Sequence, residues 1–140
     1  MRWECNGMVK IHSPQFRTED SLHAHVARLL TVAIAPPGTL SASGAFWCSI
    51  EHRNARNRLE GALRKSRGVV AGIPDIQIGY QGRTYWIELK RHDGSRSKAQ
   101  KALHPVLEAC GQPVGLCRSP EEVFGFLKKH GVPVRAEVMA

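Results

Sequence analysis

Residues 72–90 read GIPDIQIGYQGRTYWIELK, and this stretch decides the fold because it predicts a β-hairpin. Two runs rich in β-branched and aromatic residues, 75–80 and 83–90, stand on either side of Gln81 and Gly82. A glycine-containing pair between two such runs is typical of a two-residue hairpin turn. The middle of the chain is therefore predicted to form two antiparallel strands.

The predicted hairpin brings two carboxylates together. Counting back from the turn places Asp75 opposite Glu88, and paired Cβ atoms on antiparallel strands lie about 4.5 to 5.5 Å apart. Like charges at that distance are destabilising unless a cation compensates them. Because side chains alternate along a strand, Lys90 is expected on the same face as Glu88.

Two carboxylates with an adjacent lysine suit a hard divalent cation. Mg²⁺ and Mn²⁺ prefer a few carboxylates together with water and substrate phosphates, and they can acidify water and polarise a phosphodiester. Lys90 could then orient or deprotonate the attacking water, or stabilise negative charge in the transition state. The alternative is an ordinary structural cluster of charged residues on a hairpin.

Helices and a strand are predicted before the hairpin. Thr18 begins a helix whose apolar residues recur at helical spacing as far as about Ile34. A strand at 46–50 follows, because this segment is rich in strand-forming residues. A basic helix with a narrow apolar stripe is predicted at 55–66.

Further elements are predicted after the hairpin. Ser97 begins a helix that ends at Gly111, and Pro105 inside it is expected to kink the helix or delay its start. A strand at 114–117 and a helix at 119–131 complete the series. The order α-β-α-β-β-α-β-α predicts an α/β fold, a small mixed sheet flanked by helices.

The chain has the length and charge of one basic domain. Its 140 residues are predicted to form a single domain with a core at 18–130 and short extensions at both ends. There are 20 lysines and arginines against 12 aspartates and glutamates, a formal net charge of +8. The positive charge gathers at 53–67 and 90–101, which favours a polyanionic partner because neutralised phosphates release counterions. A solvated basic surface is the alternative.

Candidate contacts to a phosphate backbone lie in those two clusters. They are Arg53, Asn54, Arg56, Arg58, Arg64, Lys65, Arg91, Arg96 and Lys98. Since no base-reading module is recognisable, a nucleic acid bound by these contacts would be recognised by its shape rather than by its sequence.

The composition disfavours several classes of protein. No apolar run reaches the roughly 18 to 20 residues of a membrane span, and the first residues lack a secretory signal. A cytoplasmic location is expected, without a membrane partner or a nucleotide cofactor. The four cysteines lack zinc-knuckle spacing and are predicted to be buried or half-buried free thiols. His92, His104 and His130 are predicted to lie on the surface.

Three segments together resemble the signature of the PD-(D/E)XK nuclease superfamily. They are Gly72-Ile73-Pro74-Asp75, Glu88-Leu89-Lys90 and, further along the chain, Gln100. They are most similar to the stand-alone VRR-NUC branch of phages and bacteria, and the resemblance covers about residues 19–127. It implies a restriction-endonuclease-like core and an Mg²⁺- or Mn²⁺-dependent deoxyribonuclease.

The resemblance also implies roles for single residues. Asp75 and Glu88 correspond to the metal ligands of the family, and Lys90 corresponds to its catalytic lysine. The backbone carbonyl of Leu89 is a further candidate ligand.

Glu19 and Gln100 each have a functional and a structural interpretation. Glu19 corresponds to the glutamate on the family's first helix, and its place on the apolar stripe predicts that it faces the core, where a metal or a metal-bound water would compensate its burial. A first-turn acid favoured by the helix dipole is the alternative. Gln100 matches a family glutamine near the active site, and a capping box with Ser97 is the competing explanation.

The resemblance extends to a predicted substrate. Stand-alone proteins similar to this one act as homodimers on branched DNA such as Holliday junctions, so an endonuclease of that kind is expected. A sequence-specific restriction-type endonuclease would share the catalytic residues, but 140 residues leave little room for a target-recognition insertion. A non-catalytic basic DNA-binding protein would explain the charge but not the acidic hairpin.

Overall fold

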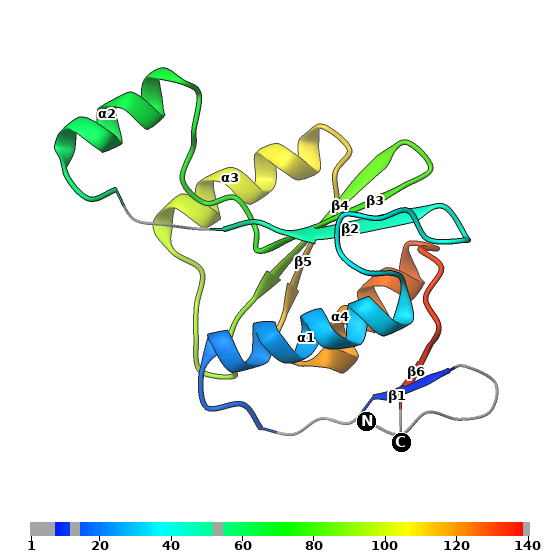
Figure 1. Cartoon of the computed structure of the whole chain (residues 1–140). Helices are drawn as coiled ribbons and strands as arrows, with labels where there is room; N and C mark the ends of the chain where they lie inside the picture. Colours follow the sequence, from blue (N-terminus) through cyan, green and yellow to red (C-terminus); the bar gives the residue numbers. More distant parts are fainter. Residues whose placement is uncertain (1–7, 12–14, 52–54, 139–140) are drawn as a thin grey trace.

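The structure is a computed structural model that describes residues 8–11, 15–51 and 55–138. A four-stranded sheet lies between two layers of helix, and a small second sheet lies below them (Figure 1). The strands of the four-stranded sheet are β2 (Ala45–Ser49), β3 (Ile76–Tyr80), β4 (Arg83–Leu89) and β5 (Val114–Cys117). The helices are α1 (Glu19–Ala33), α2 (Arg58–Ser66), α3 (Lys98–Ala109) and α4 (Pro120–Lys129). The α/β fold with a small mixed sheet is therefore as predicted.

The hairpin of β3 and β4 is confirmed with its predicted register. Tyr80 pairs with Arg83 across the turn, and Ile76 pairs with Ile87. Gln81 and Gly82 have φ angles of 50° and 73°, as the positive φ values of a type I′ turn require. The neighbouring strand β2 runs antiparallel to β3, whereas β5 runs parallel to β4, which makes the sheet mixed.

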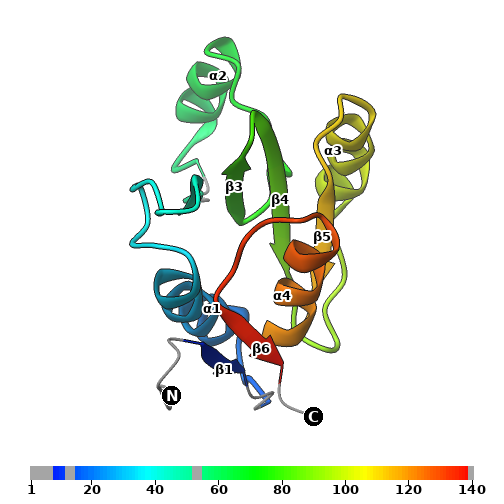
Figure 2. The same ribbon diagram turned by 90° about the vertical axis from the view of Figure 1, so that its right-hand side faces the viewer.

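The main core lies on one face of this sheet. Ile87 and Leu89 of β4 point to that face and pack with the buried residues of α1 and α4, among them Leu22, Leu30 and Phe124. The helix α1 begins where Thr18 and Ser21 form a capping box, so its start was predicted correctly. Helix α3 covers the opposite face of the sheet (Figures 1 and 2).

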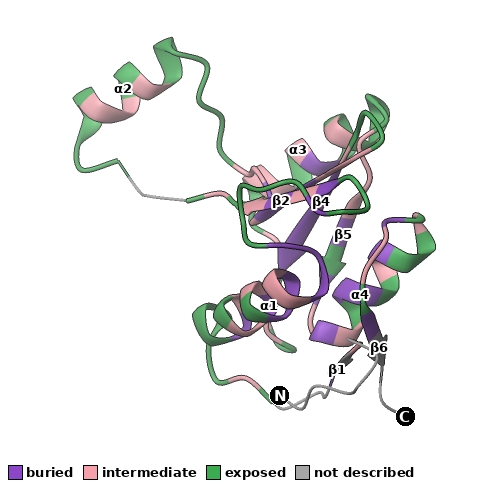
Figure 3. Ribbon diagram, turned by 45° about the vertical axis from the view of Figure 1, so that its right-hand side comes forward, coloured by how far each residue is buried: buried purple, intermediate pink, exposed green. Residues whose placement is uncertain are grey.

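Helix α2 projects from the body as an arm (Figure 3). None of its residues is buried, and the side chains of its predicted apolar stripe remain accessible, Leu59 at 69% and Leu63 at 47%. The helix begins at Arg58 and not at residue 55, because the side chain of Asn57 accepts a hydrogen bond from the Glu60 N–H and caps it there. The stripe thus faces no core in this chain.

The predicted order of elements missed two short strands. Strands β1 (Val9–Ile11) and β6 (Ala136–Val138) pair in parallel, with Val9 opposite Ala136, and form the second sheet against α1 and α4. Each has three residues, too few for a period of two to be recognised. Residues 9–11 and 136–138, which were expected in the terminal extensions, therefore belong to a sheet.

Smaller differences concern single boundaries and single side chains. Strand β2 begins one residue earlier than expected, at Ala45. Helix α3 begins directly after Ser97 and continues through Pro105, so the proline does not delay its start. Three cysteines in the described part are free thiols as predicted, although Cys110 is exposed. No helix in the described ranges is both long enough and apolar enough to cross a membrane.

Candidate active site

Asp75 stands at the entrance to β3 and is held from both sides. Its backbone carbonyl accepts a hydrogen bond from the Ile50 N–H at 2.8 Å. Its side-chain Oδ2 accepts one from the Leu89 N–H at 2.7 Å, which ties the carboxylate to β4. The ladder ends at the pair Ile76–Ile87, and the next residues on the two strands are Asp75 and Glu88, whose carboxylates interact.

Glu88 is a buried acid in an unfavourable position. The residue is 1% exposed, and its Oε2 is buried without a hydrogen-bond partner among the described residues. Burial, followed by the negative charge of Asp75, raises the pKa of Glu88 to about 7, while Lys90 acts in the opposite direction. Ionised Asp75 and Glu88 side chains repel each other, and an additional positive charge nearby would stabilise them.

Lys90 lies between two of the three predicted acids of the site, Glu88 and Glu19. Its Nζ lies 3.3 Å from Oε1 of Glu88 and 3.8 Å from Oε1 of Glu19. The side chain of Glu19 is 47% exposed, so the prediction that it faces the core is wrong. Glu19 is the first residue of α1, where its side chain leaves the apolar stripe and reaches the rim of the site.

Gln100 caps α3 and also contacts Glu88. Its Oε1 accepts a hydrogen bond from the Ser97 N–H at 2.8 Å, which completes the capping box of α3. Its Nε2 donates to Oε1 of Glu88 at 2.8 Å. Because one amide carries both a donor and an acceptor, the cap that was predicted for Gln100 and its contact with Glu88 occur together.

The Gly-Ile-Pro-Asp turn is packed against the start of α3. Gly72 has φ +94°, and a Cβ placed on it would lie 2.6 Å from the carbonyl oxygen of Ala99. Only glycine fits so close an approach in that conformation. The turn that delivers Asp75 therefore rests on the same helix that delivers Gln100.

Arg118 is a positioning residue that the sequence did not reveal. It follows β5, and its Nη1 donates to the backbone carbonyls of Arg91 and Gly94, each at 2.6 Å. A Cβ on Gly94 would lie 3.3 Å from Oε1 of Glu19, so the loop that Arg118 holds borders the rim of the site. A lone arginine after a strand carries no recognisable signal for this role.

The donor set fits a hard divalent cation. Asp75 and Glu88 are hard oxygen ligands, and the orphaned Oε2 of Glu88 is free of hydrogen bonds within the described structure. Across residues 8–11, 15–51 and 55–138, no group of three or more His, Cys, Asp or Glu side chains could hold a metal on its own. Two carboxylates completed by water and phosphate are typical of Mg²⁺ sites rather than of closed protein cages.

The predicted phosphate contacts of the first basic cluster lie on and around α2. Arg53 and Asn54 fall outside the described residues. Arg58 and Lys65 are exposed. Arg56 and Arg64 both bind the carboxylate of Glu60, so part of their charge is already compensated.

A cavity of about 750 Å³ lies between the arm and the start of α3. Arg64, Lys65 and Arg67 line it from the arm, and Gly72 and Gln100 line it from the body. Arg67 was not among the predicted contacts, although it belongs to the same basic segment of sequence. The cavity thus reaches from the basic arm to Gln100, whose amide contacts Glu88.

The second basic cluster surrounds the start of α3. Lys98 is exposed, and Arg91 lies 3.5 Å from Asp93, measured from Nε to Oδ1. Arg96 lines a further cavity together with His104. The prediction that His104 lies on the surface is wrong, since the residue is 2% exposed.

Comparison with solved structures identifies the fold. A structure described as "VRR_NUC domain protein" superposes with a TM-score of 0.60 at 19% sequence identity, covering 89% of this chain and 96% of that chain. No protein-family model matches the sequence, and no curated protein matches it either. The predicted resemblance to VRR-NUC domain proteins is confirmed at the level of the fold.

Proposed function

We propose that this chain with a VRR-NUC fold is a metal-dependent deoxyribonuclease that hydrolyses phosphodiester bonds in DNA. One observation carries the proposal: the buried carboxylate of Glu88, with an orphaned oxygen, lies opposite Asp75 and 3.3 Å from Lys90. A purely structural cluster gains nothing from an unsatisfied buried oxygen, which costs about 1–3 kcal/mol or more. A functional site compensates that cost when its ligand binds.

Asp75, Glu88 and the backbone carbonyl of Leu89 would hold Mg²⁺ or Mn²⁺, with Glu19 contributing directly or through water. The exposed position of Glu19 at the rim favours the contact through water. When bound, the ion would polarise the phosphodiester and acidify water at the site.

The remaining side chains would orient the reacting water and the ligands and would neutralise negative charge at the site. The ammonium of Lys90 can hold a water molecule for attack or stabilise the negative charge that develops on the phosphoryl oxygens. The hydrogen bond from Gln100 fixes the side chain of Glu88 in the rotamer that keeps its second oxygen available. Arg118 keeps the loop after Lys90 in place through two backbone carbonyls.

The arm and its cavity support DNA as the substrate. Arg64, Lys65 and Arg67 line the cavity that reaches Gln100, and Arg58 stands at the start of the same arm. Phosphate contacts from such residues orient a backbone without reading its sequence. Preference for branched DNA such as Holliday junctions, action as a homodimer and a cytoplasmic location are proposed from the family resemblance.

The deciding experiment compares wild type with Asp75→Ala and Lys90→Ala on plasmid, linear duplex, flap and four-way-junction DNA, each with Mg²⁺, Mn²⁺ or EDTA. Asp20→Ala, an exposed acid on the same helix as Glu19, is the matched control. Cleavage by wild type and the control, with loss in both site variants and in EDTA, supports the proposal. Equal cleavage by all four proteins would contradict the proposed nuclease function. Retained DNA binding without any cleavage by wild type would favour the non-catalytic DNA-binding protein.

A further inference from the structure

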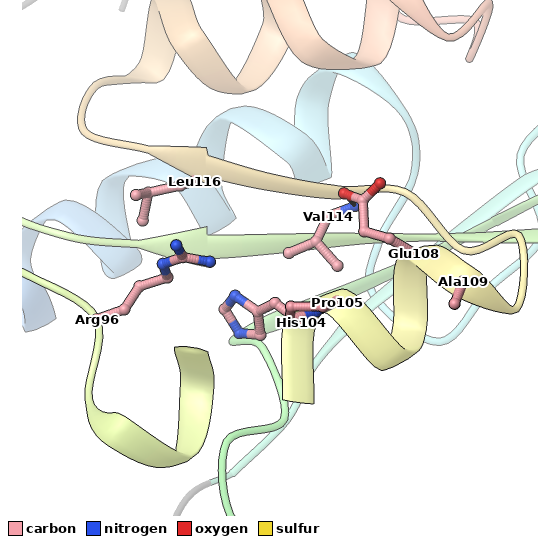
Figure 4. Close-up of a pocket in the computed structure, with 7 residues that line it drawn as sticks. All are labelled: Arg96, His104, Pro105, Glu108, Ala109, Val114 and Leu116. Carbon is pink, nitrogen blue, oxygen red and sulfur yellow. Dashed lines mark hydrogen bonds between the residues drawn. The ribbon is translucent and has the colours of Figure 1, made fainter. Parts of the chain in front are cut away.

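A second cavity, of about 550 Å³, lies between α3 and β5 (Figure 4). Its apolar wall is formed by Pro105, Val114 and Leu116, and Arg96 and His104 contribute polar side chains. Volumes between about 300 and 1,000 Å³ are typical of sites for small organic groups. The cavity therefore has the size and the mixed lining of a binding site.

His104 gives this cavity an unsatisfied polar group. The residue is 2% exposed, and neither Nδ1 nor Nε2 makes a hydrogen bond of good geometry in the described structure, although the Gly72 backbone lies near the ring. Burial, and next the positive charge of Arg96, lower the pKa of His104, while the Gly72 backbone and Asp75 act in the opposite direction. A neutral imidazole presents one donor and one acceptor, so a ligand that satisfies it offers both in return.

The other polar groups narrow the chemistry of the ligand. Figure 4 shows the guanidinium of Arg96 and the ring of His104 on the same side of the cavity. A guanidinium presents paired donors to acceptors on a planar edge. Glu108 also lines the cavity, and its Oε1 accepts the Val114 N–H at 3.0 Å, so a carboxylate disfavours a free anion there. A flat heterocycle with donors and acceptors along its edge meets all of these conditions.

The cavity adjoins the acidic cluster. His104 stands one helical turn after Gln100 on α3, and Gln100 donates to Glu88. Leu116 pairs with Glu88 across the β4–β5 ladder, so their side chains lie on the same face of the sheet. A nucleotide near the acidic cluster could place its base in this cavity only if the base left the stack.

We propose that the cavity binds a nucleobase turned out of the DNA stack, with Arg96 and His104 on its polar edge and Val114 and Leu116 against its flat face. The inference rests on the proposed function, since DNA is the assumed substrate. Unpairing and unstacking a base costs a few kcal/mol and least where the base is already unpaired. DNA with an unpaired nucleotide is consequently bound in preference to intact duplex.

Binding measured in EDTA tests this without cleavage. The full chain is titrated by fluorescence anisotropy with a duplex, with the same duplex carrying a one-nucleotide bulge, and with that bulge made abasic. Wild type is expected to bind the bulge about tenfold more tightly than the other two, which is the effect of one good set of base-edge hydrogen bonds. In Leu116→Trp, the larger side chain fills the cavity from its exposed edge. This variant should lose the preference for the bulged duplex, while its affinity for intact duplex stays that of wild type. Val106→Trp, on an exposed face of α3 outside the cavity, should keep the preference for the bulged duplex.

His104→Leu is a second variant, in which an apolar side chain replaces the buried imidazole. It should also lose the preference for the bulge, and a thermal melt establishes that it is folded. Equal affinity for the bulge and its abasic form overturns the inference, because the base is then not recognised. Equal affinity for all three DNAs overturns it too and leaves the proposed function intact, whereas absence of any DNA binding overturns both.

Discussion

Nε2 of Gln100 donates to Oε1 of Glu88 at 2.8 Å, while the amide oxygen of the same Gln100 caps α3. The orientation of a buried acid on the sheet is thereby set by the first turn of a helix. A change at Gln100 can therefore be chosen that keeps the cap and breaks the link to Glu88.

Gln100→Glu is that change. The new carboxylate still accepts the Ser97 N–H, but it cannot donate to Glu88 and it adds a like charge there. We expect cleavage to fall at least tenfold, since hydrogen bonds to charged groups contribute about 1.5–3 kcal/mol. Steady-state cleavage of plasmid DNA measures the loss, and circular dichroism checks that α3 is retained. Full activity in this variant would show that the Glu88 contact is dispensable.

The raised pKa of Glu88 predicts a pH dependence of stability in the metal-free protein. Its ordinary pKa is 4.5 and its folded pKa is about 7, so the folded chain retains this proton to higher pH than the unfolded chain. The contribution of Glu88 to the free energy of unfolding is greatest below pH 4.5. It decreases as the pH rises through 7, by an amount on the order of 2–3 kcal/mol. Urea denaturation in EDTA at pH 5 and pH 8 measures it. Glu88→Gln, which has no charge to bury, should lack this part of the pH dependence, and an unchanged difference would refute the assignment.

Divalent cations should stabilise the fold through Asp75 and Glu88. Mg²⁺ or Mn²⁺ at one hundred times its dissociation constant is expected to add about 2.7 kcal/mol to the free energy of unfolding. The midpoint of thermal unfolding, measured with and without metal, reports this without DNA. Asp75→Asn should lose the increase, while Asp93→Asn, in an exposed loop position, should keep it. An increase of equal size in both variants would place the cation elsewhere.

Gly72 should tolerate no side chain. In Gly72→Ala, the new Cβ meets the Ala99 carbonyl at 2.6 Å in a backbone of positive φ. Gly38→Ala is the matched control, because Gly38 has φ +80° but nothing within 4 Å of the added Cβ. We expect the Gly72 variant to lose about 1–3 kcal/mol more than the control, from overpacking in addition to backbone strain. Chemical denaturation of the two variants gives the difference, and equal losses would contradict the close packing.

The exposed cations of the arm should contribute to DNA binding through counterion release. Replacing Arg58 and Lys65 by Gln is expected to reduce the slope of log affinity against log salt by about 2, since each phosphate contact contributes about 0.9. The control replaces Lys128 and Lys129, two exposed lysines on α4, in the same way. Titrations at several salt concentrations measure the slopes. An equal reduction in both pairs would mean that only net charge matters.

The hairpin and its acids were predictable because their signals are local. Turn chemistry at Gln81 and Gly82 set the register, and the register placed Asp75 opposite Glu88. The pattern of α2 is equally local, but an apolar stripe does not say whether a core lies opposite it, and Leu59 and Leu63 have none in this chain.

The environments of other residues depend on contacts between distant segments. His104 is buried because α3 lies over β4 and β5, and Glu19 is exposed because α1 begins at the rim of the sheet. Periodicity within one helix could indicate neither environment. The contacts of Arg118 could not be predicted for the same reason, since its partners lie more than 20 residues earlier in the sequence.

The pairing of β1 with β6 has a consequence for the order of folding during synthesis. Val9 and Ala136 are 127 residues apart in the sequence, so their ladder forms only after all the residues between them have been synthesised. The β3–β4 hairpin closes through contacts between residues near in sequence and can form much earlier. The acidic centre can thus be assembled, and its charge repulsion already present, before the fold that surrounds it is closed.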